Sequence, residues 1–260
     1  MFHVDAFTNR PFHGNAAGVL VLERWLDASV MQAIAAENNL AETAFVAPVK
    51  AHDGTACFGI RWFSPTIEID LCGHATIASA HVLWKHLGLK GSRIVFESKS
   101  GPLPVARRGE WIELDFPARP GERVGDTRRL ARALGREPVE LFKARDYLAV
   151  FDNKRDVHEM CPDFAAVREL DCLGVIVTAP GAGHDFVSRF FAPRAGIDED
   201  PASGSPHCTL VPYWSGRLGK KSLTGHQVSK RGGEFRCEHR GDRVVIAGRA
   251  VTYMEGTIAV

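Results

Sequence analysis

Residues 73–88 read GHATIASAHVLWKHLG, and residues 204–219 read GSPHCTLVPYWSGRLG. Both stretches run from glycine to glycine over 16 residues. The first is apolar on nearly every side of a helix, which is typical of a helix buried all round. A sheet wrapped around one central helix would bury it in this way. The closing glycines, Gly88 and Gly219, suit the left-handed residue that stops a helix.

Further blocks repeat around these two stretches, in the same order. RWFSP at 61–65 recurs as RFFAP at 189–193, and SGPLPVARRGEWIEL at 100–114 echoes GGEFRCEHRGDRVVI at 232–246. The sequence therefore predicts two similar halves, 1–117 and 118–260, with central helices at about 74–88 and 205–219. The last strand is free to return to the first half. Gly73 is expected to match Gly204, and Gly101 to match Gly233.

Short segments rich in β-branched and aromatic residues, such as CFGIRWF and RIVFES, predict strands around each helix. The fold class is therefore α/β in the α+β sense, with two pseudosymmetric halves, each a curved mixed sheet wrapped around a central helix. A further helix is expected at 27–39, with Asp27 as its N-cap. Pro212 lies inside the second central helix, so we expect a kink or a lost hydrogen bond there.

Composition excludes several classes of protein. The chain has 260 residues, 45% hydrophobic and 24% charged, with a net charge of +1, which is an ordinary globular balance. Near-neutral charge gives no electrostatic reason to bind nucleic acid or an anionic membrane. No apolar run approaches the roughly 20 residues of a spanning helix, and the N-terminus reads as a strand, not a signal peptide. With six cysteines, reduced thiols and a cytoplasmic location are expected.

Titratable residues gather where the two central helices begin. DLCGH (70–74) and DEDPASGS (198–205) precede the helices, whose N-terminal N–H groups attract a carboxylate. A third candidate is Glu42 in NNLAETAFV. Each also has a purely structural reading: Glu42 as a solvated turn residue, His74 as a backbone-bonded residue, Asp200 as a capping acid and Cys72 as an inert buried thiol.

Metal and nucleotide sites have little support. Cys72, His74, His207 and Cys208 are all ligand types, but their spacings are not those of zinc sites. His207 and Cys208 are adjacent in a helix, where neighbours point about 100° apart. The chain has no Gly-x-Gly-x-x-Gly or Walker motif. We expect neither a metal nor a cofactor.

NNLAETAFV, DLCGHATIASAHVL and DEDPASGS, in this order, together with the opening DAFTNRPFHGNAAGVL, resemble the PhzF-like (phenazine biosynthesis-like) family of isomerases. The resemblance runs from about Val4 to the end. It implies the diaminopimelate-epimerase-like fold, with the active site between two halves, and a homodimer. It also implies a cofactor-independent isomerase that shifts a proton on a small carboxylate-bearing substrate.

The resemblance also assigns residues. Glu42 matches the family's acid/base glutamate, and His74 and Asp200 match its other catalytic residues. The substrate-binding positions are the two helix starts: Gly73, Ser203, Gly204 and Ser205. The sequence differs from the family pattern at Ser203, where threonine is usual, and at residues 206–208. These differences put the shape of the substrate pocket in doubt.

Two alternatives stay open. Epimerases and racemases of the wider superfamily use two cysteines, one before each helix, but here the pair is Cys72 and Ser203. Because the serine hydroxyl has far too high a pKa to replace a thiolate, a symmetric two-thiol reaction is disfavoured. Cys72 could still act with a different partner, in an epimerase or racemase. The other alternative is a catalytically silent small-molecule-binding protein.

The most specific prediction concerns the carboxyl group of Glu42. Apolar Leu40, Ala44 and Phe45 flank it in the sequence. We therefore expect burial to raise the pKa of its carboxyl group, in one cleft with His74, Asp200 and Ser205.

Overall fold

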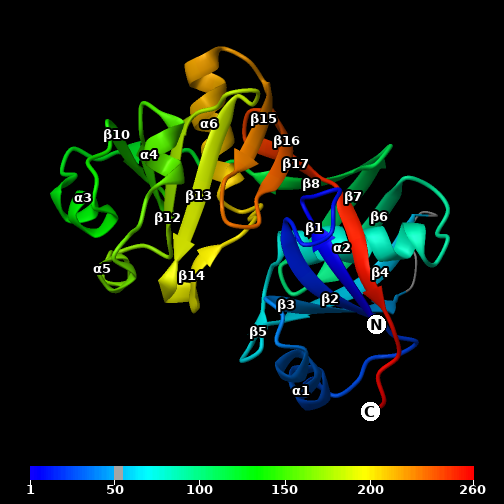
Figure 1. Ribbon diagram of the computed structural model, residues 1–260. Coiled ribbons are helices and arrows are strands. Elements are labelled where there is room, and N and C mark those ends of the chain that lie inside the picture. Colours follow the sequence, from blue (N-terminus) through cyan, green and yellow to red (C-terminus); the bar gives the residue numbers. More distant parts are fainter. Residues whose placement is uncertain (50–54) are drawn as a thin grey trace. The chain divides into compact units, whose positions relative to one another are not determined.

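The computed structural model describes residues 1–49 and 55–260, which form two compact units (Figure 1). Unit 1 comprises Met1–Asp115 and Ala247–Val260, and unit 2 comprises Phe116–Ile246. The chain thus leaves unit 1 once and returns to it at the end.

Unit 1 is a mixed sheet with two helices. Strand β1 pairs antiparallel with β2 and β18, β2 runs parallel to β3, and β3 pairs antiparallel with β4. Strand β4 runs parallel to β6, β6 pairs antiparallel with β7, and β7 pairs antiparallel with β8. The bounds are β1 (Phe2–Ala6), β2 (Asn15–Val21), α1 (Ala28–Asn38), β3 (Glu42–Pro48), β4 (Ala56–Phe63), β5 (Glu68–Ile69), α2 (Gly73–Lys85), β6 (Arg93–Ser98), β7 (Gly101–Arg108), β8 (Trp111–Pro117) and β18 (Ala250–Glu255).

Helix α2 is the core of unit 1. Every residue from His74 to Trp84 is buried, and β1, β2, β3 and β18 all pack against the helix (Figure 1). Its buried hydroxyls are satisfied locally, since Thr76 and Ser79 donate to the carbonyls of Cys72 and Ala75 at 2.5 and 2.7 Å. Helix α2 is therefore surrounded by strands of unit 1, as its apolar pattern on all sides predicts.

Unit 2 repeats this order of pairings. Strand β11 runs parallel to β12, β12 pairs antiparallel with β13, β13 runs parallel to β15, and β15 pairs antiparallel with β16. The predicted fold class is confirmed. The bounds are β9 (Glu122–Arg123), α3 (Arg128–Leu134), β10 (Glu140–Lys143), β11 (Tyr147–Val150), α4 (Lys154–His158), α5 (Phe164–Arg168), β12 (Val175–Pro180), β13 (Phe186–Ala192), the 3-10 turn Pro193–Ala195, β14 (Ile197–Asp200), α6 (His207–Leu218), β15 (Ser222–Gln227), β16 (Gly233–His239) and β17 (Arg243–Gly248).

Both central helices are shorter than the glycine-to-glycine stretches. Helix α2 ends at Lys85, and Gly88 lies in the following turn with φ +63°. Helix α6 begins only at His207, with Pro206 at its N-cap, while Gly219 is its left-handed C-cap. Asp27 is the N-cap of α1, but its side chain makes no capping bond. Gly73 and Gly219 thus mark one end of each helix closely, whereas Gly88 and Gly204 lie three residues outside α2 and α6.

Pro212 lies inside α6, where proline cannot donate to the carbonyl four residues earlier. That carbonyl, of Cys208, instead accepts a hydrogen bond from the backbone N–H of Arg119 at 2.8 Å. Trp214 anchors the next turn by donating from Nε1 to Thr178 Oγ1 at 3.0 Å. The helix tolerates Pro212 because a neighbouring segment of unit 2 replaces the lost donor.

All six cysteines are free thiols. Within residues 1–49 and 55–260, no helix has both the length and the apolar character needed to cross a membrane.

Candidate active site

Glu42 is the first residue of β3, directly after the turn that ends α1. Asn39, at φ +48°, closes that helix in the left-handed region, and β2 then pairs parallel with β3 through Ala17 and Glu42. The Glu42 side chain is 21% exposed, whereas that of His74 is 7% exposed. Glu42 is therefore more accessible than the histidine it contacts.

His74 and Glu42 form the centre of a buried polar cluster. His74 Nε2 lies 3.0 Å from Glu42 Oε2, and His74 Nδ1 lies 3.2 Å from Asn15 Nδ2. The thiol of Cys72, at the N-cap of α2, lies 3.5 Å from His74 Nδ1. Nε2 is therefore the ring nitrogen that faces Glu42, and Nδ1 faces Asn15 and the Cys72 thiol.

The turn that delivers Asn15 depends on a glycine. Gly14 has φ +64°, and a Cβ at this position would lie 2.0 Å from the Ala6 carbonyl oxygen. Asp5 Oδ2 accepts from the Phe12 N–H at 2.8 Å within the same loop. Only a residue without a side chain allows β2 to start here with Asn15 beside His74.

The predicted rise in the Glu42 pKa is wrong. Burial does raise the pKa of the carboxyl group, but the positive charge of His74 and hydrogen bonds from His74 and Cys72 lower it more, so the net shift is downward. The flanking apolar residues indicated the burial. The histidine 32 positions later in the sequence, 3.0 Å away in space, reverses the sign.

The pKa shifts of Glu42 and His74 agree with an ion pair between them. Burial alone would lower the pKa of His74, but the negative charge of Glu42 and hydrogen bonds to Cys72 and Glu42 raise it well above its usual value. Burial and the Glu42 charge raise the pKa of the Cys72 thiol. Glu42 is thus a carboxylate near neutral pH, and Cys72 is a neutral thiol.

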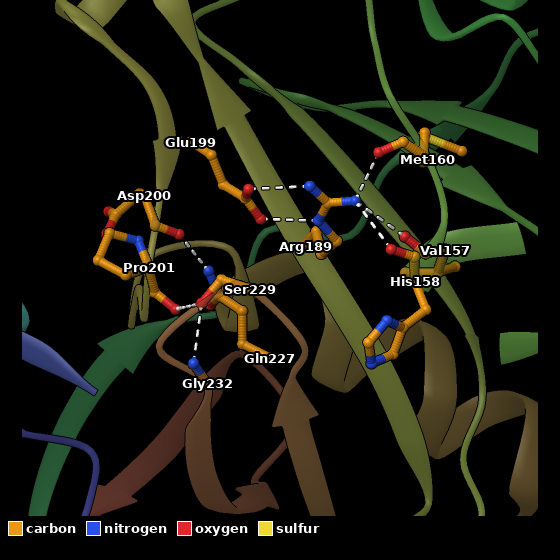
Figure 2. Close-up of polar contacts among 10 residues, drawn as sticks. All are labelled: Val157, His158, Met160, Arg189, Glu199, Asp200, Pro201, Gln227, Ser229 and Gly232. Atoms are coloured by element: carbon orange, nitrogen blue, oxygen red, sulfur yellow. Dashed lines mark hydrogen bonds and ion pairs between the residues drawn. The ribbon is translucent and has the colours of Figure 1, made fainter. Parts of the chain in front are cut away.

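The DEDPASGS segment lies in unit 2, at the end of β14, and is held by side chains of other strands (Figure 2). Gln227 donates from Nε2 to the Asp200 carbonyl at 2.5 Å and accepts from the Ser203 N–H at 2.9 Å. Ser229 donates to the Pro201 carbonyl at 2.6 Å. The backbone of this segment is therefore fixed by two side chains near the end of β15.

Two hydroxyls of this segment differ in their surroundings. Ser203 Oγ is buried without a hydrogen-bond partner among the described residues. Ser205 Oγ accepts from Arg145 Nη2 at 3.2 Å, and Arg145 is itself paired with the buried carboxylate of Asp146 at 2.6 Å. Arg145 precedes β11 much as Asn15 begins β2, so each unit brings a polar side chain to its central helix start.

His207 and Cys208 do not belong to the close group of metal-ligand types among the described residues. His207 donates from Nδ1 to the Ser203 carbonyl at 2.9 Å and stacks on Phe235 with ring centres 3.9 Å apart. Burial lowers the pKa of His207 to about 4. Among residues 1–49 and 55–260, the group of three ligand types within 4.8 Å of one another is Glu42, Cys72 and His74. These three side chains interact with one another through hydrogen bonds and an ion pair, which accounts for their closeness without a metal ion.

Unit 1 therefore brings together Glu42, Cys72, Gly73 and His74, while Asp200, Ser203, Gly204 and Ser205 belong to unit 2. That Glu42, His74, Asp200 and Ser205 line one cleft stays a prediction. Sequence reasoning missed Asn15, Arg145 and Gln227, which support the site residues. Asn15 lies in the DAFTNRPFHGNAAGVL stretch, the one signal that could have identified it.

A family model described as phenazine biosynthesis-like protein matches residues 4–256. The chain belongs to the phenazine biosynthesis-like protein family. It is 51% identical over 259 residues to an uncharacterised isomerase of Pseudomonas aeruginosa, covering 99% of this chain and 97% of the relative. The predicted family and the predicted enzyme class, an isomerase, are confirmed.

Solved structures of the phenazine biosynthesis-like family share the fold. A crystal structure of a PhzF family protein from Enterococcus faecalis is 44% identical, covers 100% of this chain and 98% of its own, and superposes with a TM-score of 0.95. A predicted epimerase from Pseudomonas aeruginosa, 18% identical with a TM-score of 0.76 and covering 100% and 98%, shares the fold alone.

Proposed function

We propose that the chain is a cofactor-independent isomerase that moves a proton between carbons of a small carboxylate-bearing substrate, with Glu42 as general acid and base. The observation that supports this is the arrangement of the buried cluster in unit 1. Its histidine and thiol are shielded, and the carboxyl group of Glu42 is the member with 21% exposure. A group that exchanges protons with a substrate must reach it directly.

The ionisation of the cluster suits the first half of such a reaction. Glu42 rests as a carboxylate, which is the form that accepts a proton from carbon. His74 holds the carboxylate at 3.0 Å and stays charged because its pKa is raised. Once Glu42 is protonated, it can return the proton to another carbon of the same substrate, so a double bond shifts and no electrons are gained or lost.

The unit 2 residues have proposed roles of their own. Asp200 would act as a second acid or base, and the backbone and hydroxyl groups at Ser203, Gly204 and Ser205 would bind substrate, as Gly73 would in unit 1. Arg145 supplies a cation within hydrogen-bond distance of Ser205. We propose that it contributes to recognition of the substrate carboxylate, because a guanidinium pairs with carboxylate in a fixed geometry.

The alternative epimerase or racemase based on Cys72 has less support. Its thiol is 6% exposed, and burial raises its pKa, so little nucleophilic or basic thiolate is present near neutral pH. The matching position before α6 is Ser203. Activity that survives replacement of Cys72 by serine but not loss of the Glu42 carboxylate would separate the two mechanisms.

Solvent deuterium exchange tests the proposal without a known product. The full chain is incubated in D₂O with a panel of small unsaturated and keto carboxylic acids, and deuterium entering carbon positions is followed by NMR. Glu42→Gln should slow exchange by about 10²- to 10⁴-fold, the range of a lost acid/base group. Glu37→Gln, at an exposed position on α1, is the matched control and should exchange normally. Exchange at the wild-type rate in Glu42→Gln would refute the role of Glu42.

The family resemblance also supports a homodimer. Sedimentation equilibrium at micromolar concentration should give twice the chain mass of 28.5 kDa. A mass equal to that of a single chain would contradict it.

A further inference from the structure

A cavity of about 470 Å³ in unit 2 has no part in the proposed reaction. Its walls come from the end of α4, the loop before β13 and the end of β15, and they carry three histidines: His158, His184 and His226. None of these belongs to the Glu42 cluster or to the 198–205 segment. Three imidazoles around one cavity are a set of transition-metal ligand types.

Two of the rings already stand at a spacing that a shared metal ion requires. The ring centres of His184 and His226 are 5.1 Å apart, with planes tilted by 42°. With Zn–N distances of about 2.1 Å, two imidazoles bound to one tetrahedral zinc ion have ring centres roughly 5 Å apart. A Cβ on Gly232 would lie 3.4 Å from His226 Nε2. Gly232 therefore has no side chain that could cover this nitrogen.

Charged side chains of both signs lie near the three histidines. Glu234 is directly opposite His226 on β16. Two cations, Lys154 and Arg155, also line the cavity, but Arg155 is paired with Glu159 at 2.8 Å.

The backbone that carries His158 is anchored. Arg189 Nη1 donates to the carbonyls of Val157, His158 and Met160 at 3.2, 3.4 and 2.7 Å, and the same guanidinium pairs with Glu199 (Figure 2). The His158 ring points away from this network in Figure 2. The ligand atoms of the three histidines do not all lie within 4.8 Å of one another, so the exposed His158 side chain would have to rotate to share an ion with the other two.

We propose that His184 and His226, joined by His158, bind one divalent transition-metal ion such as Zn²⁺ in this cavity. Water fills the remaining coordination position. Glu234 provides negative charge beside the ion, which offsets the nearby cations. The site is separate from the acid/base residues, so the proposal stands or falls independently of the proposed isomerase reaction.

Metal titration of the full chain tests the site directly. Isothermal titration with ZnCl₂ should show one ion per chain, and His184→Ala and His226→Ala should each weaken binding by at least about tenfold. His158→Ala should weaken binding less. His13→Ala, which removes a histidine of unit 1, should bind as the wild type does. Binding should be weaker at pH 6 than at pH 7.5, because protons compete for the imidazoles.

Two further measurements locate the ion. Cys72→Ser should leave zinc binding intact, and the absorbance spectrum of bound Co²⁺ should lack a thiolate-to-metal band. The proposal is overturned if the wild type binds no zinc at about 100 µM, if Cys72→Ser abolishes binding, or if the His184 and His226 variants, folded by circular dichroism, bind like the wild type. Binding of inorganic phosphate at pH 6 without zinc binding would instead make this an anion pocket, and would also overturn the proposal.

Discussion

Cys72 and Cys161 should differ sharply in reactivity, although both are free thiols. The thiolate is the reactive form, and Cys72 is buried with a raised pKa, whereas Cys161 is exposed. Iodoacetamide at pH 7.5 should modify Cys161 first, as mass spectrometry of peptides would show, with isomerase activity unchanged at that stage. Loss of activity in step with Cys72 labelling, ahead of Cys161, would instead favour the thiol-based alternative.

The Glu42–His74 ion pair should give stability a defined dependence on pH. The pKa of Glu42 is lowered from 4.5, so its contribution is present above that value and is lost as pH falls through the folded pKa. The pKa of His74 is raised from 6.5, so its contribution is present below that value and is lost as pH rises through the folded pKa. The ion pair should therefore stabilise the folded chain most between pH 4.5 and pH 6.5.

Urea unfolding of the wild type, Glu42→Gln, His74→Gln and the double variant measures this coupling at each pH. The coupling energy should be largest between pH 4.5 and 6.5. A coupling that stayed flat from pH 4 to pH 9 would show that the two groups do not form an ion pair.

Residue contacts across long sequence separations were the least predictable feature of the site. The residue types at Glu42, His74 and Asp200 and the family resemblance sufficed to select them as candidates. The 3.0 Å contact that reverses the Glu42 shift depends on how β3 is placed against α2. Burial follows from neighbours in the sequence, but charge–charge distances follow from tertiary packing.

At the scale of elements, the turn before β2 depends on Gly14. Gly14→Ala combines a left-handed φ of +64° with a Cβ only 2.0 Å from a carbonyl oxygen. It should destabilise the fold by about 1–3 kcal/mol and lower activity by displacing Asn15 from His74. Gly109→Ala is the matched control, because Gly109 has φ +63° with nothing within 4 Å. Equal losses in thermal unfolding for both variants would mean that backbone strain alone is responsible.

Helix α6 offers a second test. An internal proline usually costs a helix about 3 kcal/mol, but the carbonyl freed by Pro212 already accepts from Arg119. Pro212→Ala should therefore change the free energy of unfolding by less than about 1 kcal/mol, the net value of one hydrogen bond. A gain near 3 kcal/mol in urea unfolding would contradict this compensation.

For the whole molecule, periodicity and repetition predicted more than local signals did. The apolar helix pattern and the repeated blocks sufficed for the fold class, because a helix without a polar face must be surrounded. The order β11, β12, β13, β15, β16 repeats the parallel and antiparallel pairings of β2, β3, β4, β6, β7. The start of α6 was predicted two residues early, because Pro206 and the backbone turn after Gly204 delay the helix, and the end of α2 was predicted three residues late, at Gly88.

The return of the chain to unit 1 makes its last strand part of the first fold. Strand β18 pairs antiparallel with all of β1 and packs on α2. Thr252 Oγ1 also lies 3.0 and 2.7 Å from the ring nitrogens of His81 and His86. Removing residues 250–260 should therefore expose β1 and one side of α2, the core of unit 1, while the pairings within unit 2 stay intact. Hydrogen exchange should show lost protection in α2 and retained protection in β12 and β13. Removing only 257–260 leaves β18 whole and should preserve protection in α2, so equal protection of α2 in both truncated chains would show that β18 is dispensable to unit 1.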